Sequence, residues 1–519
     1  MTSILKYLNL AAFAACSDNE GGNESNGNGD DGNTETPADG DTYGYIKDTN
    51  GNPVEGVVVS DGYSCTATDA EGRYALTRNA DAGFVFYSLP SAYKVSVDKT
   101  YKLPRFFARL QAGTARYDFT LEALAAPEKR FDLICIGDPQ INEASHAVRF
   151  KEEAGREIRE YAASAGVPCY GITLGDHVNN KWTLFTNMVV ALQPEQTGVP
   201  VFATIGNHDH EFPTADEKAA RAKYESYFGP VDYSFNRGDV HVVSMDNVIH
   251  SCKASADYEG GFTAAQYAWL KQDLSFVPKD KMVILCVHIP FRGGWGTNSA
   301  HADADKYYDE VLDLLSQYEY AAIMSAHTHS NINYIHRKNG KEIFEHVTGT
   351  TCGAWWRSTV CTEGTPIGFG LYRIDGNRME EWAYRSVRHD EQFQIRLYRA
   401  SDTFVGGAKY RFKQTGADQI VANIWNWDPS WTVNVYENDV LSGQMTRNSD
   451  IDAWTVAYHI GLLNNTDSYR KSSDHMFHYT LKNPAAAVRV EAIDRLGKKY
   501  EQTVFTDPAE HPGDFHADF

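Results

Sequence analysis

The stretch Gly206-Asn207-His208-Asp209 stands directly behind an apolar run, PVFATI, at residues 200–205. Such a run predicts a buried strand, and the loops after the carboxyl ends of strands form the ligand sites of α/β sheets. Gly and Asn are also common turn residues, so the stretch alone is equally consistent with an ordinary loop. The same pattern recurs four more times in the chain, and this recurrence favours a site.

Four other predicted strands also end in side chains that can bind a metal ion. They are 131–136 followed by Asp138 and Gln140, 167–174 followed by Asp176, 281–287 followed by His288, and 321–324 followed by His327 and His329. A single buried histidine is more often a core residue than a ligand, but an ordered set at strand ends is hard to obtain by chance. Carboxylates, amide oxygens and imidazoles together favour two ions such as Mn, Fe or Zn over Ca.

The composition indicates a folded, acidic, multidomain protein. The 519 residues are 42% hydrophobic and 13% aromatic, which favours about three folded domains. The formal net charge is −21 and there is no run of Lys or Arg, so the chain is not expected to bind nucleic acid. No apolar run is long enough to span a bilayer.

The first 16 residues consist of a short head with one lysine, an apolar stretch at 8–15, and Cys16. They resemble a bacterial lipoprotein signal, which implies that Cys16 carries a lipid. An ordinary cleaved signal and a frayed terminus are the alternatives. Residues 17–42 are rich in Gly, Asn and Asp and predict a flexible acidic linker. We expect an exported periplasmic or outer-membrane lipoprotein that contacts the membrane only through this lipid.

Three regions follow the linker. Residues 43–126 predict an all-β sandwich and resemble transthyretin-like or carboxypeptidase-regulatory-like modules. Residues 128–385 alternate strand and helix patterns, which predicts a layered α/β domain. Residues 386–519 contain several strand-like runs, among them 454–459, and predict a second sandwich of immunoglobulin or fibronectin III type.

The order of motifs between about 130 and 385 resembles the calcineurin-like metallophosphoesterase superfamily. Residues 138–140 read Asp-Pro-Gln, which marks the Asp-x-Gln subgroup, and the whole layout resembles exported multidomain members from Bacteroidetes. The resemblance implies a four-layer α/β/β/α sandwich with two divalent metal ions. It assigns one ion to Asp138, Gln140, Asp176 and His329, and the other to Asp176, Asn207, His288 and His327. Asp176 would then bridge the pair.

The resemblance also implies that His208 faces the leaving group, where an imidazole can donate a proton. Asp209 would orient His208 or its loop. Arg292 is a candidate for holding a phosphate oxygen, with a solvated loop arginine as the alternative. His210 and His177 flank the ligand loops and are further candidates for substrate contacts.

Three further features of the sequence bear on the site. Residue 179 is Asn, where purple acid phosphatases carry a Tyr that binds ferric iron, and this disfavours that group. Trp355 and Trp356 would either stack on a substrate ring or pack in the core. Cys352 and Cys361 could form a disulfide in an exported protein.

These patterns predict hydrolysis of a small phosphomonoester or phosphodiester by metal-activated water. One alternative is hydrolysis of the pyrophosphate bond of a nucleotide diphosphate or nucleotide-sugar. Another is a non-catalytic, glycan-binding surface lipoprotein. The oligomeric state is not predicted.

Overall fold

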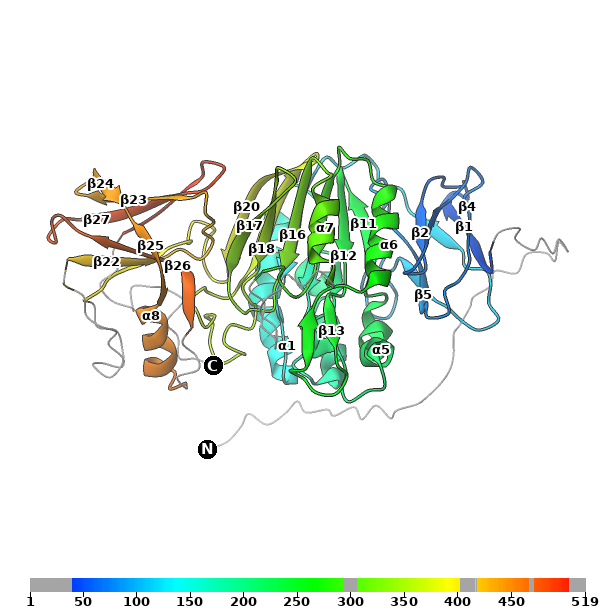
Figure 1. The fold of residues 1–519 in the computed structure, drawn as a ribbon, viewed down its shortest axis with the longest axis horizontal. Coiled ribbons are helices and arrows are strands. Elements are labelled where there is room, and N and C mark those ends of the chain that lie inside the picture. Colours follow the sequence, from blue (N-terminus) through cyan, green and yellow to red (C-terminus); the bar gives the residue numbers. More distant parts are fainter. Residues whose placement is uncertain (1–39, 293–305, 402–415, 417, 466–470, 504–519) are drawn as a thin grey trace, which may run out of the picture. The chain divides into compact units, whose positions relative to one another are not determined.

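The computed structural model describes residues 40–292, 306–401, 416, 418–465 and 471–503, which belong to one compact unit. Cys16 and nearly all of the predicted linker lie outside the described residues. Within the described part, no helix is long and apolar enough to cross a membrane. All seven predicted metal ligands lie in the middle region of the chain, which is drawn from cyan to yellow-green in Figure 1.

The middle region contains two mixed β-sheets. The five-stranded sheet has the order β10 (Val201–Thr204), β9 (Cys169–Leu174), β8 (Arg130–Ile136), β19 (Gly368–Asp375), β20 (Arg378–Ser386). The six-stranded sheet has the order β11 (Tyr233–Arg237), β12 (Val240–Ser244), β15 (Met282–Cys286), β16 (Tyr320–Ser325), β18 (Lys341–Val347), β17 (Ile332–Lys338).

The sequence of β8 shows why this region forms layers. Successive side chains of a strand point to opposite faces of the sheet. Phe131, Leu133 and Cys135 accordingly join one buried cluster, which also contains residues of the six-stranded sheet. Ile134 and Ile136 join a second cluster on the other face, with residues of four α-helices. The strand is therefore apolar on both sides, as expected for a sheet that is covered on both faces.

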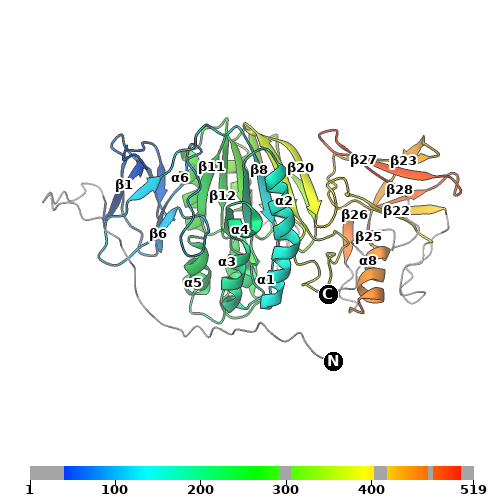
Figure 2. The same cartoon turned by 180° about the vertical axis from the view of Figure 1, so that it is seen from behind.

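Helices cover the outer faces of both sheets. Figure 2 shows α1 (Ala144–Phe150), α2 (Arg156–Ser164), α3 (Phe185–Ala191) and α4 (Pro194–Thr197) over the five-stranded sheet. Figure 1 shows α6 (Ala264–Ser275) and α7 (Tyr308–Leu315) over the six-stranded sheet. A further helix, α5 (Glu217–Phe228), follows the Gly206–Asp209 motif. The predicted four-layer α/β/β/α architecture is confirmed.

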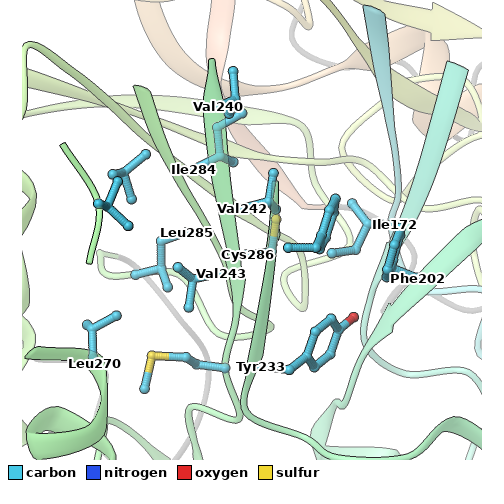
Figure 3. Close-up of a cluster of buried hydrophobic side chains, with 14 of the residues drawn as sticks. Ile172, Phe202, Tyr233, Val240, Val242, Val243, Leu270, Ile284, Leu285 and Cys286 are labelled. Carbon is cyan, nitrogen blue, oxygen red and sulfur yellow. The ribbon is translucent and has the colours of Figure 1, made fainter. Parts of the chain in front are cut away.

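The space between the two sheets is filled by aromatic and aliphatic side chains. Phe202 of β10 and Phe235 of β11 stack with ring centroids 3.9 Å apart, joining one sheet to the other. Val242, Ile284 and Cys286 of the six-stranded sheet lie in the same cluster (Figure 3). This packing holds the two sheets face to face, so that loops at their edges can meet.

The N-terminal region contains two small sheets. They have the orders β4 (Arg73–Leu76), β1 (Thr42–Asp48), β7 (Phe119–Leu121), and β3 (Cys65–Ala67), β2 (Val58–Ser60), β5 (Phe84–Tyr87), β6 (Phe107–Arg109). This region contacts α6, because Trp269 Nε1 donates a hydrogen bond to Ser60 Oγ over 3.0 Å.

The C-terminal region contains two four-stranded antiparallel sheets that share one apolar cluster. Their orders are β21 (Arg396–Arg399), β22 (Gln419–Asn423), β26 (Ser472–Thr480), β25 (Thr446–Ile451), and β24 (Val440–Gln444), β23 (Thr432–Glu437), β27 (Val488–Ile493), β28 (Lys499–Thr503).

The predicted strand at 454–459 is wrong. This segment forms α8 (Ala453–Val456) and then a π-helical turn, Ala457–Leu462. Asp452 caps the helix by accepting a hydrogen bond from the Trp454 backbone N–H over 3.0 Å, and the guanidinium of Arg396 lies 3.7 Å from the Trp454 ring centroid. The aromatic residues that suggested a strand are thus buried as part of a helix.

An ion-pair network joins the five-stranded sheet to the C-terminal region. Glu391 accepts a hydrogen bond from Arg373 Nη2 over 2.6 Å and also contacts Lys498. Burial by itself would raise the pKa of the Glu391 carboxyl, but the hydrogen bonds and charges of Arg373 and Lys498 lower it to about 2. A carboxyl whose pKa falls on folding stabilises the fold above its unfolded pKa and loses that contribution as the pH falls through the folded value.

Glu391→Gln is therefore expected to lower the free energy of unfolding at neutral pH by up to about 3 kcal/mol. The difference between wild type and variant should shrink by more than half at pH 3, which lies between the unfolded value near 4.5 and the folded value of about 2. Urea unfolding at pH 6.5 and pH 3 measures both differences. Equal differences at the two pH values would contradict the assignment.

Candidate metal centre

The predicted ligand loops meet at one edge of the two facing sheets. β8, β9 and β10 are parallel, as are β12, β15 and β16, so the carboxyl ends of each set lie together. Two groups of side chains converge there, Asp138 with Asp176 and His329, and Asp176 with His288 and His327. Within each group, the possible ligand atoms lie within 4.8 Å of one another. Asp176 is shared by both groups, as a bridging ligand would be.

Two side-chain amides complete this arrangement. Asn207 Oδ1 lies 3.0 Å from His288 Nε2, in the second group. Gln140 Nε2 donates a hydrogen bond to Asp176 Oδ2 over 3.1 Å, beside the first group. The seven predicted ligands therefore lie close together: five form the two groups, and Asn207 and Gln140 lie beside them.

His288 is held in the tautomer that a metal ligand requires. Its Nδ1 donates a hydrogen bond to the Leu174 carbonyl over 2.7 Å, which leaves Nε2 directed at the centre. There Nε2 lies 3.3 Å from Asp176 Oδ1 and 3.1 Å from His327 Nδ1. Possible ligand atoms thus crowd around Nε2, an arrangement that a shared cation would stabilise.

The backbone at these loops is strained. Five of the seven residues have a positive φ, between 37° and 67°: Asp138, Gln140, Asp176, His327 and His329. Residues other than glycine rarely adopt this region, and each instance costs on the order of 1–3 kcal/mol. Such strain persists where the surrounding structure imposes it, and it is concentrated at functional sites.

Glycine is required where two of the loops approach each other. Gly175 has a φ of +93°, and a Cβ atom there would lie 2.4 Å from His288 Nδ1. A Cβ atom on Gly206 would lie 2.3 Å from the Asp176 backbone nitrogen. Both glycines let the loops pack closely enough to bring the ligand side chains together.

The buried carboxylates of the centre favour the binding of positive charge. Burial raises the pKa of the Asp138 carboxyl well above its usual range, and the neighbouring Asp176 carboxylate adds to this rise. Burial opposes the charged form of His288, but Asp176 and Asp138 raise the pKa of His288 to about 9. Divalent cations would supply the charge that these buried carboxylates need.

Two buried oxygens show that the side chains fit metal ions. Asp138 Oδ1 and Gln140 Oε1 accept no hydrogen bond from any residue that the structure describes. A buried acceptor without a partner is costly, and coordination to a cation would satisfy it. The residues present therefore fit a pair of divalent ions.

His208 lies at the accessible side of the centre. Its side chain is 24% exposed, and its Nε2 is 4.0 Å from Asp176 Oδ2. Its backbone N–H donates a hydrogen bond to Asp176 Oδ1 over 2.9 Å. The ring is oriented by Asn180, whose Oδ1 lies 2.8 Å from His208 Nδ1. The sequence analysis missed Asn180, although its place four residues after Asp176 was a usable signal.

Asn180→Ala is expected to lower kcat by about 10–100-fold, because misplacing a catalytic group by about 1 Å costs that much. The affinity for metal ions should stay within twofold, since Asn180 contacts the ring of His208 and not the ligands. Steady-state kinetics and calorimetric metal titration measure the two effects. The exposed Asn339→Ala, in the β17–β18 turn, is the control. An unchanged kcat in Asn180→Ala would contradict this role.

Asp209 braces the loops around the centre through both of its carboxylate oxygens. Its Oδ1 accepts hydrogen bonds from the His177 and Val178 backbone N–H groups, over 2.8 and 3.2 Å. Its Oδ2 accepts hydrogen bonds from the Gly206 N–H and from His177 Nδ1, both over 3.0 Å. Of the two predicted roles of Asp209, the structure favours orientation of the loop.

The prediction that His177 and His210 contact substrate is wrong, because both are fully buried. His177 is held between Asp209 and Thr173 Oγ1, which lies 2.7 Å from its Nε2. His210 Nδ1 lies 2.9 Å from the Gly206 carbonyl and Nε2 lies 3.2 Å from Asp246 Oδ2. Burial opposes the charge on His210, yet Asp246 raises its pKa. Both histidines support the ligand loops from behind.

Arg292 is exposed and its guanidinium lies 5.7 Å from the Tyr334 ring centroid. It lines a small cavity together with Trp427 and Arg447 of the C-terminal region. The structure shows no contact between Arg292 and the ligand side chains among the described residues, so its role in holding phosphate stays a prediction.

The two tryptophans, Trp355 and Trp356, differ in their burial and in their contacts. Trp356 is buried, and its Nε1 donates a hydrogen bond to the Pro139 carbonyl over 2.9 Å, so it packs behind the first motif. Trp355 is half-buried, with its ring centroid 4.9 Å from that of His329. Tyr258, which no sequence signal marked, is also half-buried, with its hydroxyl 3.3 Å from His327 Nε2. Two aromatic residues therefore border the centre.

Cys352 and Cys361 are free thiols in this structure, so the possible disulfide is not formed. Both sulfur atoms lie near the Thr350 hydroxyl, at 3.4 and 4.0 Å. Cys352 Sγ also lies 4.0 Å from His329 Nδ1.

The fold and the side chains at its edge define a class, the α/β/β/α sandwich proteins with a site for paired metal ions. A model of the calcineurin-like phosphoesterase domain matches residues 117–331. Models of the N-terminal and C-terminal parts of calcineurin-like phosphoesterases match residues 41–124 and 345–500. The chain belongs to the calcineurin-like phosphoesterases.

Known relatives match only part of the chain. Purple acid phosphatase 23 of Arabidopsis thaliana is 26% identical over 181 residues, which cover 32% of this chain and 36% of that protein. Purple acid phosphatase 18 of the same plant is 25% identical over 182 residues, which cover 33% of this chain and 38% of that protein. The matched part thus spans little more than a third of these relatives, and Asn179 still differs from the tyrosine expected of that group.

Solved structures are similar over about half of the chain. The purple acid phosphatase PPD1 from yellow lupin has a TM-score of 0.36 and 14% identity, covering 51% of this chain and 53% of its own. The 5'-nucleotidase from Candida albicans has a TM-score of 0.31 and 13% identity, covering 51% of this chain and 52% of its own.

Proposed function

We propose that this protein hydrolyses a phosphomonoester or phosphodiester at a centre of two divalent metal ions. The observation that carries the proposal is the convergence of five predicted ligands into two groups that share Asp176, with Asn207 and Gln140 beside them. Mn, Fe and Zn suit the mixed carboxylate, amide and imidazole donors. Two such ions, when bound, lower the pKa of water and offset the charge of the phosphoryl oxygens.

The residues around the centre have distinct tasks in this proposal. His208 is the accessible imidazole, and Asn180 orients it so that Nε2 can donate a proton to the departing alkoxide oxygen. Asp209 ties the loop of Asp176 to the loop of Asn207 and so keeps the two sets of ligands in register.

Trp355 and Tyr258 form an apolar border against which the non-phosphate part of a substrate would lie. Each is half-buried and packs against a histidine of the His327–His329 turn. An aromatic border of this kind excludes water from one side of the centre and accepts a sugar or aromatic ring by stacking.

A panel of substrates tests the proposal. Metal-stripped protein is supplied with Mn²⁺ and offered p-nitrophenyl phosphate, bis-p-nitrophenyl phosphate and a nucleotide-sugar. Release of p-nitrophenol from either aryl ester supports the proposal, and the ratio of the two rates assigns a monoesterase or a diesterase. Cleavage of the nucleotide-sugar alone would favour a pyrophosphate-bond hydrolase. Metal binding without turnover of any of the three would contradict the proposal.

The predicted export as a lipoprotein is a separate proposal. It is supported by the resemblance of residues 1–16 to a lipoprotein signal, and labelling of Cys16 with a radioactive or clickable fatty acid tests it.

A further inference from the structure

The turn His327-Thr328-His329 carries one ligand for each of the two proposed ions. Both histidines have left-handed backbone conformations, with φ values of 67° and 54°. The middle domain holds one side of this turn, because the His327 backbone N–H donates a hydrogen bond to Asp138 Oδ2 over 3.0 Å. A turn with two such residues needs further contacts to keep its shape.

Those contacts come from the C-terminal region. Lys471, the residue before β26, donates hydrogen bonds from Nζ to the Thr328 carbonyl and to Ser330 Oγ, each over 3.0 Å. The backbone N–H of Lys471 donates to the Thr362 carbonyl over 3.3 Å, which fixes the start of the side chain. Thr328 and Ser330 are buried, so water does not replace the ammonium group readily.

Neighbouring groups reinforce this contact. Asn331 Nδ2 donates a hydrogen bond to the Trp425 carbonyl over 2.6 Å, again from the middle domain to the C-terminal region. The Asn331 backbone N–H donates to Glu363 Oε1 over 3.1 Å. Burial lowers the pKa of the Lys471 ammonium group to about 8, and the charge of the buried Glu363 carboxylate opposes this fall.

We infer that the C-terminal β-sandwich is part of the scaffold of the metal centre, and that Lys471 is a positioning residue for the His327–His329 turn. The inference rests on the proposed metal centre. Lys471 holds the carbonyl of Thr328, the residue between the two histidines. By fixing this carbonyl, it fixes the directions of both imidazole rings. Loss of an outer contact of this kind typically weakens metal binding by about 10–100-fold.

Calorimetric titration of the metal-stripped full-length protein with Mn²⁺, without substrate, tests this inference. Lys471→Met keeps the length of the side chain and removes its charge and its donors. We expect it to weaken the binding of at least one of the two ions by about 10–100-fold. Lys499→Met is the matched control, because Lys499 bonds to Glu491 within the other C-terminal sheet, between β27 and β28. The control should bind both ions within twofold of wild type.

Two further measurements separate positioning from general loss of structure. The visible absorption of the Co²⁺-loaded protein reports how the histidines coordinate, and Lys471→Met should change it while Lys499→Met should not. Ser330→Ala removes one acceptor of the Lys471 ammonium group and should weaken binding about threefold, with no additional loss when combined with Lys471→Met.

Wild-type affinity and an unchanged Co²⁺ spectrum in Lys471→Met would overturn the inference. If circular dichroism shows that Lys471→Met does not fold, the Mn²⁺ affinity of Ser330→Ala tests the inference instead. An unchanged Mn²⁺ affinity in Ser330→Ala would also overturn it. A wild-type protein that binds no Mn²⁺ would instead contradict the proposed metal centre itself.

Discussion

Asp176→Asn is expected to lower kcat/KM by about 10⁴-fold, which corresponds to about 5 kcal/mol of transition-state stabilisation. Among the residues that the structure describes, Asp176 alone is shared by both groups of ligands, so its carboxylate is required on both sides of the centre. The substitution removes the charge of that side chain and alters the ligand shared by both ions, while the volume of the side chain is kept.

The same variant separates a metal role from a structural one. Bound metal per chain, measured by elemental analysis after dialysis, should fall from about two toward one or zero. Because Asp176 also accepts hydrogen bonds from His208 and Gln140, thermal unfolding is measured alongside. The exchange Asp375→Asn, at an exposed ion pair with Arg130, is the control and should change neither quantity. Full metal content with full activity in Asp176→Asn would disprove the bridging role.

His208→Ala has the second largest expected effect, a loss of about 10²–10⁴-fold in kcat. The loss should depend on the leaving group, because a general acid matters most when the departing alkoxide is basic. We expect the smaller loss with p-nitrophenyl phosphate, whose phenolate leaves readily, and the larger loss with an alkyl phosphate such as glycerol phosphate.

Metal binding should change little in His208→Ala, since His208 is not among the converging ligands. His389→Ala, at a histidine stacked on Phe393 close to the C-terminal region, serves as the control. Equal losses with both classes of leaving group would argue that His208 binds the phosphoryl group without donating a proton.

The architecture and the convergence of the candidate ligands were predictable because their signals are local. β8, β10 and β15 appear as short apolar runs, and each is followed within a few residues by Asp138, Asn207 or His288. Parallel strands bring their carboxyl ends to one edge of a sheet, so the order of the motifs is enough to predict that the ligands meet. The helices over the sheets follow from their apolar periodicity in the same way.

The contacts around the ligands were not predictable, because they join residues that are distant in the sequence. Asn180 reaches His208 across 28 residues, and Lys471 reaches Thr328 across 143. No pattern in the chain distinguishes Lys471 from other polar residues, and only the place of Asn180 four residues after Asp176 marks that side chain. For His177 and His210, a local sequence signal led to a wrong prediction. Their places beside the ligands suggested substrate contacts, but both rings are buried in the protein.

The helix at Ala453–Val456 shows the same limit for secondary structure. The run 454–459 has the aromatic and β-branched residues of a strand. Its conformation is decided by the Asp452 cap and by the packing of Trp454 on Arg396, and the second of these is a tertiary contact. Propensity is overridden where such contacts are available.

The central claim is that this chain hydrolyses a phosphoester with two metal ions held by the converged ligands. The most direct measurement is the rate of p-nitrophenyl phosphate and bis-p-nitrophenyl phosphate hydrolysis as Mn²⁺ is added stepwise to metal-stripped protein. We predict that activity appears and saturates near two ions per chain, and that Asp176→Asn stays inactive throughout. Activity that is independent of added metal, or no activity with two ions bound, would contradict the account.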